Sequence, residues 1–237
     1  MTGFSRVLGD DLGELLGNRI PADHSRQVLA DHYAARLRPR RVLDLGCGAG
    51  DSVDLFRAAV PDVSWVGADV ERSPEVDERI RADAEFVTFD GRRLPFDDAG
   101  FELVFCKQVL EHVEHPHELL REAARVLEPG GHLAGSTSQL EAFHSRSIFN
   151  PTPYGFTRAA EDAGLEVIEL RPVIDGFTLV AWRALGLPAF FHRWWARESP
   201  PYRLIELAAR AARLDARTRN QIKLVLAGQF AFLARRP

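Results

Sequence analysis

Residues 41–52 read RVLDLGCGAGDS, and this stretch decides the fold class. Its first five residues form a short apolar run that one acid, Asp44, interrupts, which is typical of a buried parallel strand. Three glycines follow at alternate positions: Gly46, Gly48 and Gly50. A helix can then begin at Asp51. A strand that turns this tightly into a helix presents bare backbone N–H groups, so the stretch predicts a site for a polar ligand.

Two classes of ligand use such a turn. A dinucleotide site has the pattern G-x-G-x-x-G, in which the last glycine lets the helix approach the strand beneath the pyrophosphate. Here the third glycine comes one residue early, and Asp51 stands in the dinucleotide position, where its charge would repel a pyrophosphate. Asp44 suits a ligand that carries an ammonium group. An NAD-linked oxidoreductase stays as an alternative interpretation, with Asp51 against it.

The glycine stretch resembles the first motif of the class I S-adenosylmethionine-dependent methyltransferases, an apolar strand and an acid followed by G-x-G-x-G. The runs LPFDDAGFELVFCKQVLEHV (94–113) and EAARVLEPGG (122–131) are similar to small-molecule methyltransferases of the same class. The resemblance is close over residues 41–138 and looser to the end of the chain. It implies methyl transfer to a small molecule, with S-adenosyl-L-methionine as cofactor.

An acid also ends the second predicted strand. From Gly50 to Asp69 is 69 − 50 = 19 residues, the usual reach from a glycine loop to the acid that binds the ribose hydroxyls. The resemblance implies that Asp90 accepts a hydrogen bond from the adenine amino group and that the backbone of Gly91 meets the ring.

Lys107 stands where the family often has a small polar residue, so we expect it to contribute its backbone. Its side chain could instead pair with Asp44 or reach an anionic substrate. The candidate cofactor-binding residues are Asp44, Gly46, Cys47, Gly48, Gly50, Asp69, Val70, Asp90, Gly91 and Lys107.

The order of elements predicts an α/β fold, a Rossmann-like, doubly wound sheet of seven strands that is mixed but mostly parallel, with helices on both faces. The predicted strands are 41–45, 63–70, 86–89, 101–106, 132–138, 165–170 and 225–233. We expect a single methyltransferase domain over 1–237. Its parts are an N-terminal helical cover (1–40), a cofactor-binding core (41–138), an acceptor-facing loop (139–154) and a helical insertion before the last strand (174–224).

Composition narrows the class of protein. The chain has 237 residues, 46% of them hydrophobic, which suffices for one substantial core. A net charge of −4 gives no overall basic field that would recruit nucleic acid. No apolar run approaches a membrane span, and the first residues lack a signal-peptide core. The only cysteines, Cys47 and Cys106, are too few for a disulfide framework or a zinc site. We expect a cytoplasmic enzyme without a metal.

The acceptor should bind beside the loop that follows the fifth strand. Transfer of a methyl group to a hydroxyl needs a base, and His144 in this loop is the first candidate, with His112 as the second. His112 could equally cap or pack at a helix start. The candidate substrate-binding residues are Glu141, Arg146 and Tyr154. We expect an oxygen acceptor on a glycosylated or secondary-metabolite substrate. A non-catalytic protein that binds S-adenosylmethionine is a further alternative.

The insertion is rich in aromatic residues and arginine. Residues 183–219 contain eight arginines and three acids, a local charge of 8 − 3 = +5 in an acidic protein. It could form a lid over an apolar or phosphate-bearing substrate, or a patch that touches an anionic membrane surface. It could also be a helical pair packed on the core with a solvated basic face or a dimer contact, which is the interpretation we favour. The sequence does not predict the oligomeric state.

Overall fold

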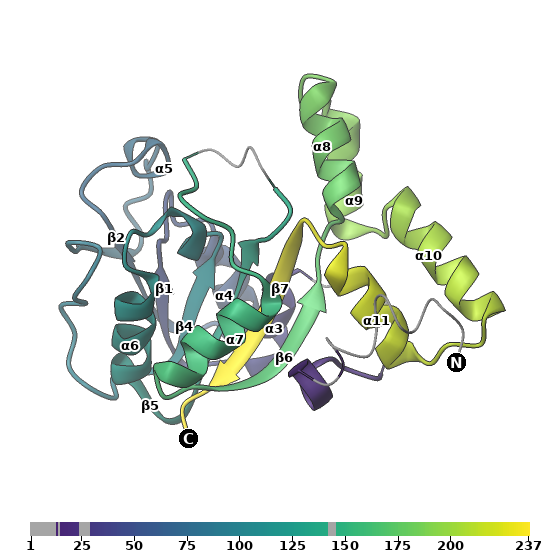
Figure 1. Ribbon diagram of the computed structural model, residues 1–237. Helices are drawn as coiled ribbons and strands as arrows, with labels where there is room; N and C mark the ends of the chain where they lie inside the picture. Colours follow the sequence, from purple (N-terminus) through teal and green to yellow (C-terminus); the bar gives the residue numbers. More distant parts are fainter. Residues whose placement is uncertain (1–12, 14, 24–28, 142–145) are drawn as a thin grey trace.

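Seven strands form one mixed sheet in the order β3-β2-β1-β4-β5-β7-β6 (Figure 1). The computed structural model describes residues 13, 15–23, 29–141 and 146–237. β1 to β5 pair in parallel, and β7 pairs antiparallel with both β5 and β6. The strands are β1 (Arg41–Leu45), β2 (Ser64–Asp69), β3 (Glu85–Thr88), β4 (Phe101–Lys107), β5 (Leu127–Ser138), β6 (Glu166–Pro172) and β7 (Gln229–Arg235). The predicted fold class is confirmed.

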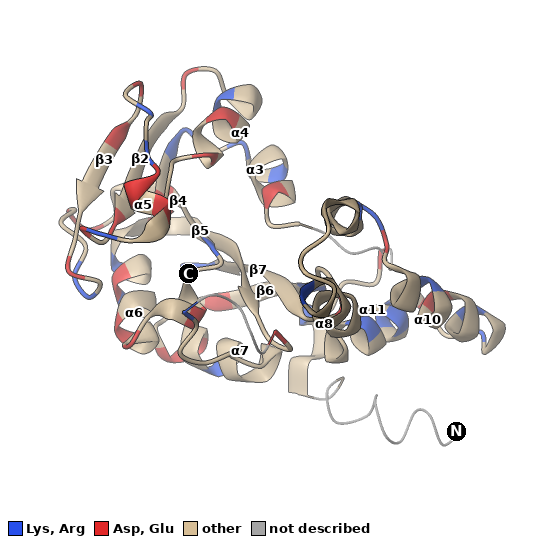
Figure 2. Cartoon of the chain, turned by 90° about the horizontal axis from the view of Figure 1, so that it is seen from above, with Lys and Arg blue, Asp and Glu red and all other residues tan. Residues whose placement is uncertain are grey.

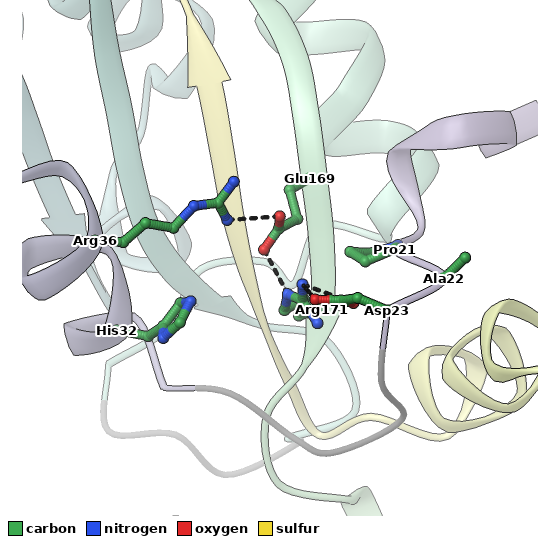
Figure 3. A pocket seen from close by; sticks show the side chains of 7 residues that line it. All are labelled: Pro21, Ala22, Asp23, His32, Arg36, Glu169 and Arg171. Atoms are coloured by element: carbon green, nitrogen blue, oxygen red, sulfur yellow. Dashed lines mark hydrogen bonds and ion pairs between the residues drawn. The ribbon is translucent and has the colours of Figure 1, made fainter.

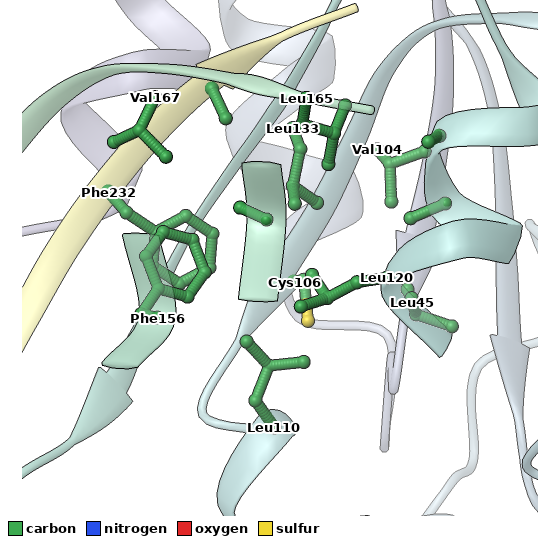
Figure 4. Close-up of a cluster of buried hydrophobic side chains, with 14 of the residues drawn as sticks. Leu45, Val104, Cys106, Leu110, Leu120, Leu133, Phe156, Leu165, Val167 and Phe232 are labelled. Carbon is green, nitrogen blue, oxygen red and sulfur yellow. The ribbon is translucent and has the colours of Figure 1, made fainter. Parts of the chain in front are cut away.

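Helices cover both faces of the sheet, because the strand residues alternate between two apolar cores. On one face, α3 (Asp31–Leu37) and α4 (Ser52–Ala59) pack against Val42, Leu103 and Phe105. On the other face, α6 (Pro116–Val126) and α7 (Pro153–Asp162) pack against the second core. Its members include Leu45, Val104, Cys106, Leu133 and Phe232, and Phe156 of α7 stacks on Phe232 with ring centroids 4.2 Å apart (Figure 4).

The connection between β6 and β7 is helical and projects beyond the carboxyl edge of the sheet (Figure 1). It consists of α8 (Gly176–Ala184), η3 (Ala189–His192), α9 (Arg193–Ala196), α10 (Pro200–Ala211) and α11 (Ala216–Val225). Aspartates begin two of these helices. The Asp175 carboxylate accepts from the N–H of Thr178, and that of Asp215 accepts from the N–H of Thr218, both at 2.8 Å.

Two predicted boundaries are wrong. The last strand begins at Gln229 and not at residue 225, because α11 continues to Val225. β5 begins at Leu127, where it pairs with Phe101, and not at residue 132. The short helix α5 (Pro74–Asp77) follows β2, and Ile80 beyond its end is 98% exposed.

The remaining short elements are η1 (Gly17–Arg19) and η2 (Leu110–His112). None of the helices in the described part of the chain is long and apolar enough to cross a bilayer.

Candidate active site

The order of the sheet reverses between β1 and β4, since β2 and β3 follow on one side and β5 on the other. Ligands of open α/β sheets bind at the carboxyl ends of the strands at this position. The glycine loop after β1 lies there and is anchored to β2, because the N–H of Gly46 donates to the carbonyl of Ala68 at 2.7 Å. Gly46 has a φ of +71°, and a Cβ on it would lie 2.3 Å from a methyl of Val109. Only glycine fits at this position.

Asp69 fixes the other side of the same loop. Its carboxylate accepts from the N–H of Gly48 at 2.7 Å and from that of Val70 at 2.8 Å. The side chain is half-buried at the end of β2, and Val70 beside it is exposed. The acid is therefore held in place by backbone donors next to the glycine loop, at the position that the spacing predicted. Each carboxylate oxygen has a second lone pair for a further donor.

Asp44 is a buried carboxyl group at the end of β1, with 4% of its surface exposed. The hydroxyl of Ser52 donates to it at 2.5 Å, and the indole N–H of Trp65 donates in turn to Ser52 at 3.0 Å. Burial raises the pKa of Asp44 to about 7, and the charge of Asp69 adds to this rise, whereas the Ser52 hydrogen bond opposes it. Such a carboxylate gains most from a cation placed next to it.

Lys107, at the end of β4, does not form an ion pair with Asp44. Its ammonium group forms an ion pair with Asp31 of α3 at 2.9 Å, and the side chain is exposed. Of the two alternatives considered from the sequence, the pairing with Asp44 is replaced by this ion pair with Asp31, and a contact with an anionic substrate stays a prediction. The side chain turns toward α3 and leaves the backbone of Lys107 at the strand end.

Asp90 and Gly91 follow β3 at the next strand end along the sheet. The Asp90 carboxylate accepts from the N–H groups of Arg92 at 2.9 Å and Arg93 at 2.8 Å. These backbone hydrogen bonds lower the pKa of Asp90, so the exposed carboxylate is ionised at neutral pH. Gly91 has a φ of +79°, which lets the chain turn away directly after the acid.

Arg79 covers the glycine loop and was not anticipated. Its guanidinium donates to the carbonyl of Gly48 from Nε at 2.9 Å and from Nη2 at 2.7 Å, and it lies 4.0 Å from the centroid of the Phe86 ring. Cys47 in the same loop is buried, and burial raises the pKa of its thiol to about 12. This cysteine is therefore a packed thiol and not a nucleophile.

A buried polar network occupies the ends of β4 and β5, where the acceptor loop begins. Glu111 is completely buried, and its carboxylate accepts from the Thr137 hydroxyl at 2.9 Å and the Ser138 N–H at 3.1 Å. Its carbonyl accepts from the N–H of Ile148 at 2.7 Å. Gln108 joins the network through Ser136 and Ser138 and has a φ of +57°. Neither residue belongs to a pattern that is visible in the sequence, beyond a lone acid between Leu110 and His112.

Glu141 belongs to the same network. Only 3% of it is exposed, and its carboxylate accepts from the hydroxyl of Ser138 at 3.1 Å, the amide of Gln229 at 2.7 Å and the guanidinium of Arg183 at 3.0 Å. Arg183 comes from α8, so this contact joins the acceptor loop to the helical insertion. The carbonyl of Glu141 also accepts from the side chain of Asn150 at 3.1 Å.

The other predicted acceptor residues lie further out. His112 ends η2 directly beyond β4 and is half-buried. Arg146 and Tyr154 are exposed, the latter in the first turn of α7. His144 lies outside the described residues. No cluster of three or more His, Cys, Asp or Glu side chains able to hold a metal ion occurs among residues 13, 15–23, 29–141 and 146–237.

A cavity of about 410 Å³ lies between α3 and β6 (Figure 3). None of the residues that line it belongs to the glycine loop. Its walls are charged but paired. Glu169 accepts from the Tyr33 hydroxyl at 3.1 Å and from Arg36 at 2.8 Å, and Arg171 pairs with Asp23 at 3.0 Å. Because these charges compensate one another, the cavity offers no uncompensated group like Asp44 at the strand ends.

Residues 43–135 match the family model described as "Methyltransferase domain". The relatives named here each align with less than half of the chain. The chain is 36% identical over 117 residues to 27-O-demethylrifamycin SV methyltransferase of Amycolatopsis mediterranei, covering 45% of this chain and 42% of that protein. It is 36% identical over 106 residues to the ubiquinone/menaquinone biosynthesis C-methyltransferase UbiE of Ectopseudomonas mendocina, covering 41% of each. The matched segment thus spans less than half the length of these relatives.

Solved structures extend the likeness in fold to nearly the whole chain. The S-adenosylmethionine-dependent methyltransferase of Mesorhizobium loti superposes with a TM-score of 0.52 at 18% identity, over 87% of this chain and 98% of that one. The [4+2]-cyclase SpnF superposes with a TM-score of 0.59 at 23% identity, over 96% and 93%.

The matched segment and the fold together define the class: residues 43–135 match a methyltransferase domain, and the sheet that contains them has the fold of class I S-adenosylmethionine-dependent methyltransferases. S-adenosyl-L-methionine is the cofactor of that domain. The residues at its strand ends fit this group, since a buried carboxyl group with a raised pKa and two further acids flank a glycine loop with positive φ angles.

Proposed function

We propose that the protein transfers the methyl group of S-adenosyl-L-methionine to an oxygen atom of a small molecule, a glycosylated compound or a secondary metabolite. The observation that carries the proposal is Asp44, a buried carboxyl group whose pKa is raised to about 7 beside the glycine loop. A cationic ligand relieves this cost of burial, whereas a pyrophosphate would add negative charge. This favours S-adenosylmethionine, which has an ammonium group, over a dinucleotide.

The three acids at the strand ends take separate parts of the cofactor in this proposal. Asp44 holds the ammonium group, Asp69 accepts from the ribose hydroxyls, and Asp90 with the backbone of Gly91 holds the adenine. The glycine loop and the backbone of Lys107 complete the wall. When bound, the cofactor supplies a methyl group on a sulfonium, and the protein contributes by holding the acceptor in line with it.

A base at the acceptor side removes the proton of the hydroxyl. His144, in the loop after β5, is the first candidate, and His112, at the end of η2, is the second. Tyr154 and Arg146 orient the acceptor, and both are exposed beside that loop. Glu141 contributes through its buried contact with Arg183, which ties the loop to α8.

The named relatives support a small-molecule acceptor and leave the methylated atom to experiment. The rifamycin relative is named for an O-methyl group, and the UbiE relative is named for C-methylation. The same fold occurs in a structure described as a [4+2]-cyclase, so the fold alone does not establish methyl transfer. A direct assay has to show turnover and identify the atom.

Incorporation of isotope-labelled methyl from S-adenosylmethionine tests the proposal on a panel of hydroxylated metabolites, glycosides and quinols, with NMR of the product to identify the methylated atom. We expect methyl ethers as products. His144→Ala should lower kcat by about 10²–10⁴, while the exposed His117→Ala serves as control and should leave kcat unchanged. Labelled carbon-methyl products would overturn the oxygen assignment, and cofactor binding without turnover on any acceptor would favour a non-catalytic protein.

A further inference from the structure

The helical insertion exposes large apolar side chains along α8 and at the end that is farthest from the sheet. Phe177 and Val180 lie on α8, and Leu185, Leu187 and Phe190 lie in and after the turn that follows it; all are exposed, with Leu185 at 65% and Phe177 at 64%. We call Leu185, Leu187 and Phe190 the apolar tip. Figure 1 shows α8 and α9 standing side by side, with α8 rising away from the sheet toward the turn at 185–188.

The helix α8 has apolar residues on its outer side, away from the core. Thr178 and Leu179 are buried against the core, as in any surface helix. On the opposite side, residues 177, 180 and 184 follow one another at helical spacing, and none of them is polar. In Figure 2, α8 is seen nearly end-on and is mostly uncharged, with Lys and Arg along the neighbouring α10 and α11. A soluble surface helix normally carries charged residues on this outer side.

Positive charge surrounds the apolar tip. Residues 176–197 contain no acid and three arginines, at positions 183, 193 and 197. The Arg193 guanidinium lies 4.5 Å from the centroid of the Trp194 ring, and that of Arg203 lies 5.5 Å from the same ring. Arg193 also lies 5.6 Å from the centroid of Phe190, so Arg193 contacts the apolar tip directly and shares Trp194 with Arg203.

A second copy of the chain suits this surface poorly. A twofold contact would place the arginines of one tip opposite those of the other, with no acid within 176–197 to compensate them. Apolar side chains that project from a small tip, with aromatic residues and arginine at its base, are typical of an element that inserts into the headgroup region of an anionic bilayer.

We propose that the apolar tip docks the protein reversibly on an anionic membrane surface, with Leu185, Leu187 and Phe190 entering the interface and Arg193 and Arg203 contacting lipid headgroups. Leu140, at the start of the acceptor loop, is exposed and packs against Gly176 at the foot of α8. The acceptor loop therefore lies at the opposite end of α8 from the docking tip. The inference stands on the insertion alone and does not depend on the proposed function.

Co-sedimentation of the full chain with vesicles tests this directly. We expect binding to vesicles of phosphatidylglycerol and phosphatidylcholine in equal parts at low salt, weaker binding at higher salt, and little binding to phosphatidylcholine alone. The double variant Leu185→Asp/Phe190→Asp should lower the partition coefficient at least about tenfold, since each aspartate replaces an inserting side chain with a charge. Arg193→Ala should lower it about fivefold.

Matched controls keep the test specific. Ile80→Asp replaces an apolar side chain that is 98% exposed elsewhere on the molecule, and Arg72→Ala removes an exposed arginine there. Both should bind vesicles like the wild type, and thermal melts should show that all variants fold. Absence of binding to the anionic vesicles, or binding that the tip variants do not change, would overturn the proposal. A wild-type dimer in analytical ultracentrifugation that the double variant dissociates, without vesicle binding, would assign the tip to a second copy.

Discussion

Asp44 lies where water is largely excluded, so its ionised form destabilises the folded protein when no ligand is bound. Its folded pKa of about 7 lies above the ordinary value of 3.8. Between these two values the folded state binds more protons than the unfolded state. The contribution of this group to stability is thus fully present below pH 4 and is lost as the pH rises through 7. A bound ammonium group reverses this cost, which links cofactor binding to pH.

This linkage gives a prediction for S-adenosylhomocysteine, which keeps the ammonium group. Below pH 7 its binding must release a proton from Asp44, so affinity should rise with pH by up to about tenfold per pH unit and level off above 7. Calorimetry from pH 5.5 to 8.5 measures this. Asp44→Asn should remove the slope, whereas Asp77→Asn, at an exposed acid, should keep it. A pH-independent affinity in the wild type would show that Asp44 does not face the ammonium group.

At the scale of elements, the ion pair between Glu141 and Arg183 joins the acceptor loop to α8. The Glu141 side chain is 3% exposed and that of Arg183 is 27% exposed. The loop is held on its other side by Glu111, whose carbonyl accepts from Ile148. The Glu141 carboxylate and the Glu111 carbonyl, from different segments, thus hold the two described parts of this loop, and the insertion is tied to Glu141.

Removing Arg183 takes away the guanidinium that forms an ion pair with the buried Glu141 carboxylate at 3.0 Å. Arg183→Met is expected to lower the free energy of unfolding by about 3 kcal/mol in urea titrations. Arg158→Met serves as control, because Arg158 is 58% exposed and pairs with acids at 3.8 and 3.9 Å. That control should change stability by less than about 1 kcal/mol. Equal effects of the two substitutions would show that the Glu141 contact does not fix α8.

Across the whole molecule, local patterns predicted the sheet and its acids, because a strand that ends in Asp44 or Asp69 shows itself within a few residues. The features that were missed depend on neighbours distant in the sequence. Glu111 is satisfied by Thr137 and Ser138, and Glu141 by Arg183, and no local pattern reports such pairings. The positive φ of Gln108 is another tertiary effect, since a glutamine seldom adopts it. The position of Arg79 over the glycine loop likewise depends on the fold, because Arg79 and Gly48 are 31 residues apart in the sequence.

Charge is unevenly distributed over the chain. The chain has a net charge of −4, while residues 183–219 have a local charge of +5. The acids that bind the cofactor in our proposal lie at the ends of β1, β2 and β3, in the half of the sheet farther from β6 and the insertion that follows it (Figure 1). The molecule therefore separates an acidic cofactor side from a basic, apolar tip.

The central claim is that the glycine loop and its acids bind S-adenosylmethionine and not a dinucleotide. Calorimetric titration of the full chain with S-adenosylhomocysteine and, separately, with NAD tests it most directly, with Asp69→Ala as the variant and a thermal melt to check its fold. We predict one S-adenosylhomocysteine per chain, no heat of binding with NAD, and an affinity in Asp69→Ala that is weaker by about 1.5–3 kcal/mol, as for a hydrogen bond to a charged group. Binding of NAD in place of S-adenosylhomocysteine, or an unchanged affinity in the folded Asp69→Ala variant, would contradict the claim.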